Sequence, residues 1–245
     1  MKNQISNPVN FDPNTFKYKF LRDGNIKLGD SIATWSTLKG DEEIWIEQLG
    51  LKVLGTCKNC SVCTKDCYVN KSYARYPTVP YGHARNTLGL RLAFDKVFKD
   101  LDNQIKRARN PIKIVRINQS GEVEDQKQML GWCNLAKNNP KTIFYMYTKM
   151  YDIATEVLLS NKVPNNLVIL FSIWHDLGVK EFEAVRHLPN VKAFVYDDGN
   201  IQIKPQVYCK AYDDKGHLNH EETCQQCGKC FGKNPKMQIV GCKGH

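Results

Sequence analysis

The sequence has no apolar run long enough to cross a membrane, since a spanning helix needs about 20 apolar residues. It starts Met-Lys-Asn-Gln and stays polar, so we expect no secretory leader. Its ten cysteines are clustered, whereas small secreted disulfide proteins distribute theirs along the chain. We therefore expect neither a membrane partner nor a disulfide scaffold, and we predict a cytoplasmic protein with reduced thiols.

Acidic residues are outnumbered in this chain, with 25 Asp and Glu against 35 Lys and Arg, a formal charge of +10. A basic balance favours anionic partners such as nucleic acid. The formal value counts each cysteine as a neutral thiol, and eight thiolates on two clusters would remove a good part of the positive charge. The charge alone is therefore weak support for nucleic-acid binding.

Hydrophobic residues make up 42% of the chain, which is enough for one sizeable core. We expect a single domain, residues 1–245, in three parts. They are an N-terminal arm (1–40), a β/α core with the first cysteine loop (41–195), and a cysteine-rich C-terminal segment (196–245).

Four cysteines lie within eleven residues at Cys57, Cys60, Cys63 and Cys67, separated by two, two and three residues. Thiols this dense suit a loop around a [4Fe-4S] cube, and the spacing is that of the bacterial ferredoxin run. Tyr68 replaces the proline that follows the last ferredoxin cysteine. In two-cluster ferredoxins that last cysteine serves the other cluster. The run predicts an iron–sulfur site, and the cluster that Cys67 serves stays open.

A second set of cysteines lies near the C-terminus at Cys224, Cys227 and Cys230, with Cys209 and Cys242 as rival fourth ligands. The compact spacing again predicts a [4Fe-4S] cluster. Zinc is the alternative for this set, because one separate cysteine and three close ones can also form a tetrahedral site.

Strand and helix patterns alternate four times after the first cysteine loop, and a shorter strand at 51–56 leads into it. Predicted helices lie at 84–109, 125–138, 151–159 and 179–187, and predicted strands at 112–117, 142–147, 167–174 and 191–195. This order predicts an α/β fold with a parallel sheet, a complete or partial TIM-like (β/α) barrel. We expect cysteine-rich loops in its N- and C-terminal parts and the site at the C-terminal strand ends.

Polar residues directly follow these apolar strands. Arg116, Glu122, Thr148 and Lys149 are the candidate catalytic residues, which would bind an anionic substrate or transfer protons. Arg116 is the strongest candidate, since an arginine between two buried apolar neighbours on a strand needs a carboxylate or an anionic ligand. The alternative for each residue is that loops are polar because water surrounds them.

Several short motifs carry a family resemblance. They are Thr56-Cys57, Cys63 to Cys67-Tyr68, Arg85-Asn86, Val115-Arg116-Ile117, Ser120-Gly121-Glu122, Trp132, Tyr145-Met-Tyr147-Thr148-Lys149, Thr223 to Phe231 and Gly244-His245. In this order they resemble the "gene product 88" family of phages and other mobile elements, which lacks an established function. The chain departs from the family at Glu122-Val123, where the family usually has Asp-Phe.

The resemblance implies a layout similar to radical-SAM-type barrels, and it favours Cys209 with the three C-terminal cysteines. Binding of S-adenosylmethionine is doubtful, because Asn70 stands where the third cysteine of the radical-SAM order would be. A closed cube with four local thiols is the simpler interpretation, and such a cube passes electrons or holds structure.

Two classes of function agree with the sequence. The first is a redox or radical-type iron–sulfur enzyme with an unknown small or anionic substrate and an electron donor as partner. The second is a nucleic-acid-binding protein with structural metal sites, in which Tyr68, Tyr73, Arg75, Tyr76 and Tyr81 would contact the nucleic acid. For the first class we expect the C-terminal segment to fold back across the strand ends and bring the two cysteine sets near each other.

Overall fold

The structure, a computed structural model, describes residues 21–22, 27–65, 67–211, 222–232, 234 and 237–243. Residues 1–20 of the predicted arm and the terminal Gly244-His245 motif therefore lie outside the described residues. Within these ranges, no helix combines the length and the apolar composition that a membrane crossing needs.

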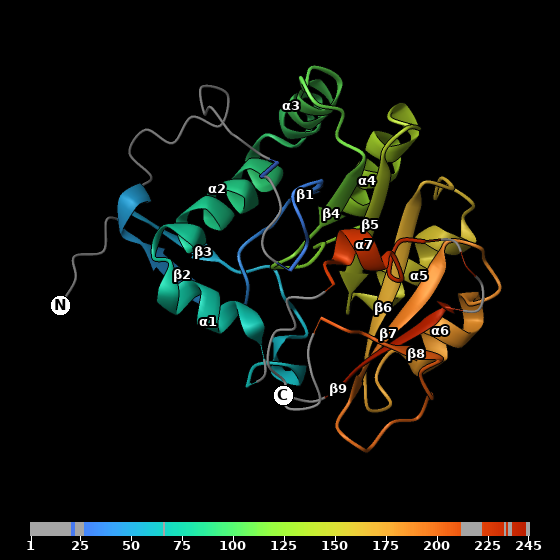
Figure 1. Cartoon of the computed structure of the whole chain (residues 1–245). Helices are drawn as coiled ribbons and strands as arrows, with labels where there is room; N and C mark the ends of the chain where they lie inside the picture. Colours follow the sequence, from blue (N-terminus) through green and yellow to red (C-terminus); the bar gives the residue numbers. More distant parts are fainter. Residues whose placement is uncertain are drawn as a thin grey trace.

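Seven parallel strands form the central sheet (Figure 1). Their order across the sheet is β1 (Ile32–Thr34), β4 (Ile114–Ile117), β5 (Ile143–Thr148), β6 (Leu167–Trp174), β7 (Val191–Asp197), β9 (Ile239–Lys243) and β8 (Val207–Tyr208). Each of β4, β5 and β6 pairs in parallel with the strand that follows it in the chain, as β/α crossovers produce. The predicted α/β fold with a parallel sheet is confirmed.

The sheet is open, with β1 and β8 at its two ends and no pairing between them among the described residues. These end strands have three and two residues, which is too short for the continuous ladder that closure requires. The complete TIM-like barrel of the prediction is thus not formed by the described strands.

Different elements pack against the two faces of the sheet. One face packs against α3 (Phe94–Lys106), α4 (Gln126–Asn138), α5 (Tyr151–Leu159) and α6 (Val179–Val185). Side chains alternate along the strands, so Phe144 and Ile169 point to these helices while Tyr145 and Leu170 point to the other face. That other face is covered by Leu28, by Phe231 and by the short helix α7 (Cys224–Cys227) (Figure 1). The cysteine-rich C-terminal segment therefore lies on the face that the crossover helices leave free.

A smaller unit, which with the segment that follows β1 we call the N-terminal unit, precedes the main alternation. It contains the antiparallel hairpin of β2 (Glu43–Ile46) and β3 (Leu51–Leu54), two 3-10 turns η1 (Glu47–Leu49) and η2 (Cys60–Val62), and the helices α1 (Tyr68–Arg75) and α2 (Thr78–Leu92).

The helix predicted at 84–109 is two helices, because the chain breaks at Ala93, whose φ is −141° and ψ 46°. The helices α2 and α3 on either side of the break have different packing partners. Ala84 of α2 packs with Ile46 of the hairpin, whereas Val97 and Leu101 of α3 pack in the main core. The prediction of a single helix was therefore wrong. The apolar repeat continues from α2 into α3, but α2 packs against the hairpin and α3 against the main core.

Candidate functional site

A cavity of about 190 Å³ opens where the parallel strands end. Cysteines of both sets line it: Cys57, Cys63 and Cys67 of the first run, with Cys209, Cys224, Cys230 and Cys242 from the C-terminal segment. Strand-end residues, among them Arg116, Lys149 and Trp174, complete the wall. The prediction that the C-terminal segment folds back across the strand ends is confirmed. We call this space the central cavity.

The first cysteine loop begins where β3 ends, and backbone hydrogen bonds fix its start. The Thr56 N–H donates to the Leu38 carbonyl at 3.0 Å, and the Cys57 N–H donates to the Gly40 carbonyl at 2.9 Å. On the far side of the loop, the Asn59 amide donates to the Lys149 carbonyl at 2.7 Å. The loop is therefore attached both to the N-terminal unit and to the end of β5.

The thiols of this loop differ in their environments. Burial, and then the nearby Glu122 carboxyl, raise the pKa of Cys57 to about 12. The Cys63 thiol donates a hydrogen bond to Cys67, which raises the pKa of Cys63 and is the main cause that lowers the pKa of Cys67 to about 6. Cys60 does not line the central cavity, and its sulfur accepts a hydrogen bond from the Thr64 hydroxyl at 3.7 Å. Three of the four predicted ligands thus face the cavity.

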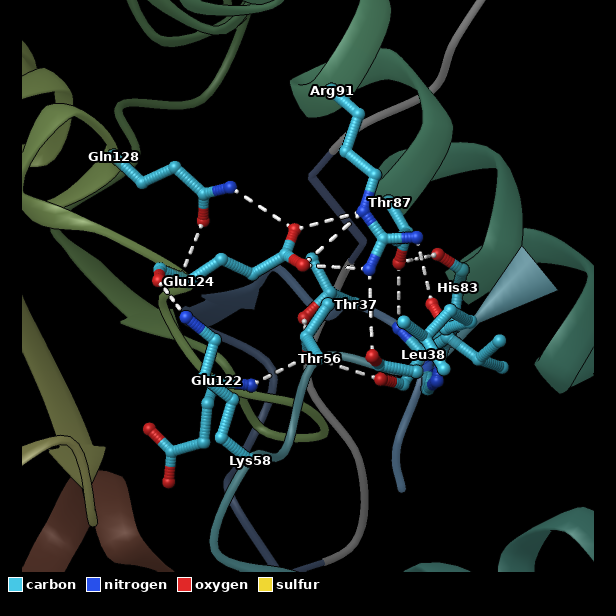
Figure 2. Close-up of polar contacts among 12 residues, drawn as sticks. Thr37, Leu38, Thr56, Lys58, His83, Thr87, Arg91, Glu122, Glu124 and Gln128 are labelled. Carbon is cyan, nitrogen blue, oxygen red and sulfur yellow. Dashed lines mark hydrogen bonds and ion pairs between the residues drawn. The ribbon is translucent and has the colours of Figure 1, made fainter. Parts of the chain in front are cut away.

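A group of threonine contacts holds this loop against the segment that follows β4 (Figure 2). The Thr37 and Thr56 hydroxyls lie 3.1 Å apart, and the Thr56 hydroxyl accepts the Glu122 N–H at 2.8 Å. In Figure 2 the Glu122 carboxylate points away from this group. We call Thr37, Thr56 and the Glu122 N–H the threonine clasp.

Beside the clasp, Arg91 of α2 pairs with Glu124 at 2.6 Å and donates to the Leu54 carbonyl at 2.8 Å (Figure 2). The Gln128 amide of α4 also donates to Glu124, at 3.2 Å. These contacts connect the N-terminal unit, the β4 loop and α4, so the first cysteine loop has a fixed support.

The second cysteine set surrounds a small void of about 20 Å³, lined by Cys209, Cys224, Cys227 and Cys230. Cys242 lines the central cavity but not this void. Burial is the main cause that raises the pKa of Cys242 to about 11, and the nearby Cys209 thiol adds to the rise. Between the two predicted rivals, Cys209 is thus the one grouped with the other three thiols.

Burial is the main cause that raises the pKa values of Cys224 and Cys230, the latter to about 12, and the neighbouring thiols add to it. Since metals bind thiolates, binding at either set would release protons from these buried thiols.

The second set is held on the sheet from two sides. The Cys224 N–H donates to the Lys27 carbonyl at 2.8 Å, and Thr223 with Gln226 forms a capping box at the start of α7. From β7, the Lys192 ammonium donates to the Lys229 carbonyl at 2.6 Å and to the Met237 carbonyl at 3.0 Å. Lys192 therefore connects the middle of the sheet to the residue before Cys230.

Arg116 lies on β4, where it pairs with Tyr145 in the register, and it points to the face under α7. Its guanidinium lies 4.8 Å from the centre of the Tyr147 ring. Its buried Nε has no hydrogen-bond partner among the described residues. Burial acts to lower the pKa of Arg116, and the surrounding tyrosine hydroxyls and the Cys224 thiol outweigh it, so the net change is upward. This cation is placed as predicted, in the wall of the cavity.

The other three predicted catalytic residues meet at the end of β5. The Thr148 hydroxyl and the Lys149 N–H donate to the two Glu122 carboxylate oxygens at 2.9 and 3.0 Å. Burial raises the pKa of Glu122, while the nearby Lys149 opposes the rise. Glu122 and Lys149 line the central cavity, and the Lys149 ammonium lies 5.5 Å from the Trp174 ring. Thr148 is buried and does not line the cavity, so it positions Glu122 and does not face a ligand.

Sequence reasoning missed two residues of the site. Asn118 follows β4 with a left-handed φ of 52°, lines the cavity, and has a buried Oδ1 without a hydrogen-bond partner in the described part of the chain. The sequence feature that could have identified Asn118 is its position directly after the apolar strand 112–117. Lys192 was detectable as a lysine inside the apolar strand 191–195.

The aromatic residues of the nucleic-acid alternative do not form one exposed surface. Tyr68 and Tyr76 are 44% and 50% exposed. Tyr73 and Tyr81 pack against the small core of the N-terminal unit, and the Tyr73 hydroxyl hydrogen-bonds the His83 Nδ1 at 2.9 Å. Of the four tyrosines, only Tyr68 and Tyr76 are therefore exposed enough for nucleic-acid bases to stack on them.

The donor chemistry of both sets fits iron–sulfur clusters, because each offers four cysteine thiols and no other ligand type is needed. Within the described ranges, no group of three or more His, Cys, Asp or Glu side chains converges as the ligands of a metal ion. Iron–sulfur and zinc binding at the two sets both remain predictions.

No curated protein and no solved structure matches the chain. A family model described as gene product 88 matches residues 19–233. That range contains both cysteine sets with Cys209, and it excludes Cys242. Since the match covers most of the chain, the protein belongs to the gene product 88 family.

Proposed function

We propose that this chain is an iron–sulfur protein of a phage or mobile element that performs redox or radical-type chemistry in the central cavity. One [4Fe-4S] cluster would be held by Cys57, Cys60, Cys63 and Cys67. A second would be held by Cys209, Cys224, Cys227 and Cys230. The open parallel sheet would serve as a partial, radical-SAM-like barrel.

The observation that carries this proposal is the shared cavity. Two cysteine sets that are far apart in the sequence line one space at the strand ends, together with cationic and aromatic side chains. Clusters with a purely structural role have no need to face a common cavity. Ligands of open α/β sheets bind at the carboxyl ends of the strands, which is where this space lies.

Each side chain around the cavity has a distinct role in the proposal. When bound, the clusters would supply one-electron transfer. The Arg116 guanidinium would bind an anionic group of the substrate, because it is buried and its Nε is free to donate. Lys149 would add a second cation over Trp174. Glu122 would hold a proton near the cavity, since burial favours its neutral form.

S-adenosylmethionine is not part of the proposal. Asn70, which stands in place of the third radical-SAM cysteine, donates its side-chain amide to the Thr64 carbonyl at 3.0 Å. The residue therefore supports the first cysteine loop from α1 and offers no thiolate.

The test is an assay of iron and acid-labile sulfide after anaerobic purification. We expect about eight of each per chain, and about four after Cys63→Ser or Cys230→Ser. Cys133→Ser is the matched control, because Cys133 is buried in α4 beside other core residues and should leave the iron content unchanged. Zinc in place of iron at either set, or equal iron in all four proteins, would contradict the proposal.

A further inference from the structure

We infer that the central cavity binds a small carboxylate that also carries an O–H or N–H donor, as hydroxy acids and amino acids do, through Arg116 and Asn118. The inference rests on the proposed function for the location of the site. It narrows the ligand from an anion in general to a class with two required groups.

The first required group follows from Arg116. Its side chain lies among rings and thiols, and no carboxylate of the described residues forms an ion pair with it. A buried guanidinium is stable only when anions or acceptors surround it. Its Nε lacks an acceptor within the described part of the chain. A carboxylate oxygen from a bound molecule would supply that acceptor, and arginine matches carboxylates with paired N–H donors.

The second required group follows from Asn118, two residues further along the same strand end. The residue is 6% exposed, and its Oδ1 is the other buried polar atom of the cavity wall that lacks a partner in the described residues. An amide oxygen accepts hydrogen bonds and cannot donate them. Leaving it unpaired costs about 1–3 kcal/mol. The ligand therefore needs a donor, which a simple carboxylate such as acetate does not carry.

Two further polar residues of the cavity wall, Glu122 and Lys149, already have neighbours within the protein. Both Glu122 oxygens accept hydrogen bonds from Thr148 and Lys149. The Lys149 ammonium lies over Trp174, which stacks on Tyr196 with ring centres 4.0 Å apart. These rings give the cavity an apolar side that suits the carbon skeleton of an organic acid better than a bare inorganic anion.

The experiment is calorimetric titration of the anaerobically purified holoprotein with acetate, glycolate and inorganic phosphate. Glycolate is acetate with one added hydroxyl, so the difference between their affinities measures the contribution of that hydroxyl donor. We expect glycolate to bind about three- to tenfold more tightly than acetate, the gain of one hydrogen bond. Asn118→Ala should remove this preference and leave acetate binding unchanged. Arg116→Met should weaken both by about 10- to 100-fold, the loss of a charged hydrogen bond.

Arg186→Met is the control, because Arg186 pairs with Glu183 of α6 and lies outside the cavity wall. This variant should bind both acids as tightly as the parent protein does. Equal affinity for glycolate and acetate, or phosphate bound more tightly than glycolate, would overturn the inference. Should Arg116→Met lose its iron, the Asn118→Ala comparison alone decides. Full iron without anion binding refutes this inference only, whereas anion binding without iron refutes the proposed function only.

Discussion

Replacement of Gly121 by alanine tests the support of the first cysteine loop. Gly121 has a φ of +78°, which costs a residue with a side chain about 1–2 kcal/mol. A methyl group there would overlap the Thr37 hydroxyl and lie 2.6 Å from the Thr56 hydroxyl, the two side chains of the threonine clasp. Such overpacking typically costs a further 1–3 kcal/mol or so. We expect a total loss of about 2–5 kcal/mol of unfolding free energy.

Gly50→Ala separates the two contributions. Gly50 also has a left-handed φ, of +61°, but no atom lies within 4 Å of an added methyl group. It should show the backbone cost alone. For a chain of this size each kcal/mol lowers the Tm by about 2–4 °C, so Gly121→Ala should melt about 2–12 °C below Gly50→Ala in calorimetry.

The iron content of Gly121→Ala gives a second measure, since the Glu122 N–H can no longer reach Thr56 if the clasp opens. We expect iron to be lost from the first set. Equal melting of Gly121→Ala and Gly50→Ala would refute the threonine clasp as the support of the loop.

Three further predictions follow from single contacts. Cys60→Ser should lose the first cluster as Cys63→Ser does, because the proposal makes both thiols ligands of that cluster although Cys60 does not line the cavity; full iron in Cys60→Ser, measured anaerobically, would contradict this. Lys192→Met should lower the unfolding free energy by about 2–4 kcal/mol and release iron from the second set, because two carbonyls lose a charged donor. An unchanged unfolding free energy in denaturant, or an unchanged iron content, would contradict this prediction. Burial lowers the pKa of His83 to about 3, below the unfolded value of about 6.5, so its contribution is full above pH 6.5 or so and is lost as the pH falls toward 3. His83→Phe should flatten the dependence of the unfolding free energy on pH in that window, and an unchanged pH dependence in denaturant unfolding would contradict this.

The main alternation of the fold could be predicted from the sequence because its hydrophobic repeats are regular. The helix at 151–159 and the strand at 167–174 have the predicted bounds. The break at Ala93 could not be predicted, since the apolar repeat continues through it and only the two packing surfaces differ. Barrel closure likewise depends on strand pairing at the sheet ends, which local patterns do not encode.

The candidate site could be predicted as a set of cysteines and strand-end residues, but not in its detail. Arg116 stood out as a charge within an apolar strand, and it lines the cavity. Thr148 and Glu122 follow strands in the same way, yet they hydrogen-bond each other. Whether a polar side chain faces a ligand or a neighbour depends on distances between strands. Asn118 was missed for the same reason, because an unpaired oxygen is visible only in three dimensions.

The central claim is that two clusters face one cavity, and electron paramagnetic resonance of the fully reduced protein tests it most directly. Two reduced clusters on the walls of one cavity should show spin–spin coupling, which broadens or splits their signals. Cys230→Ser, which removes a ligand of the second cluster, should leave the simple uncoupled signal of the first. Two additive, uncoupled signals in the parent protein would contradict the account.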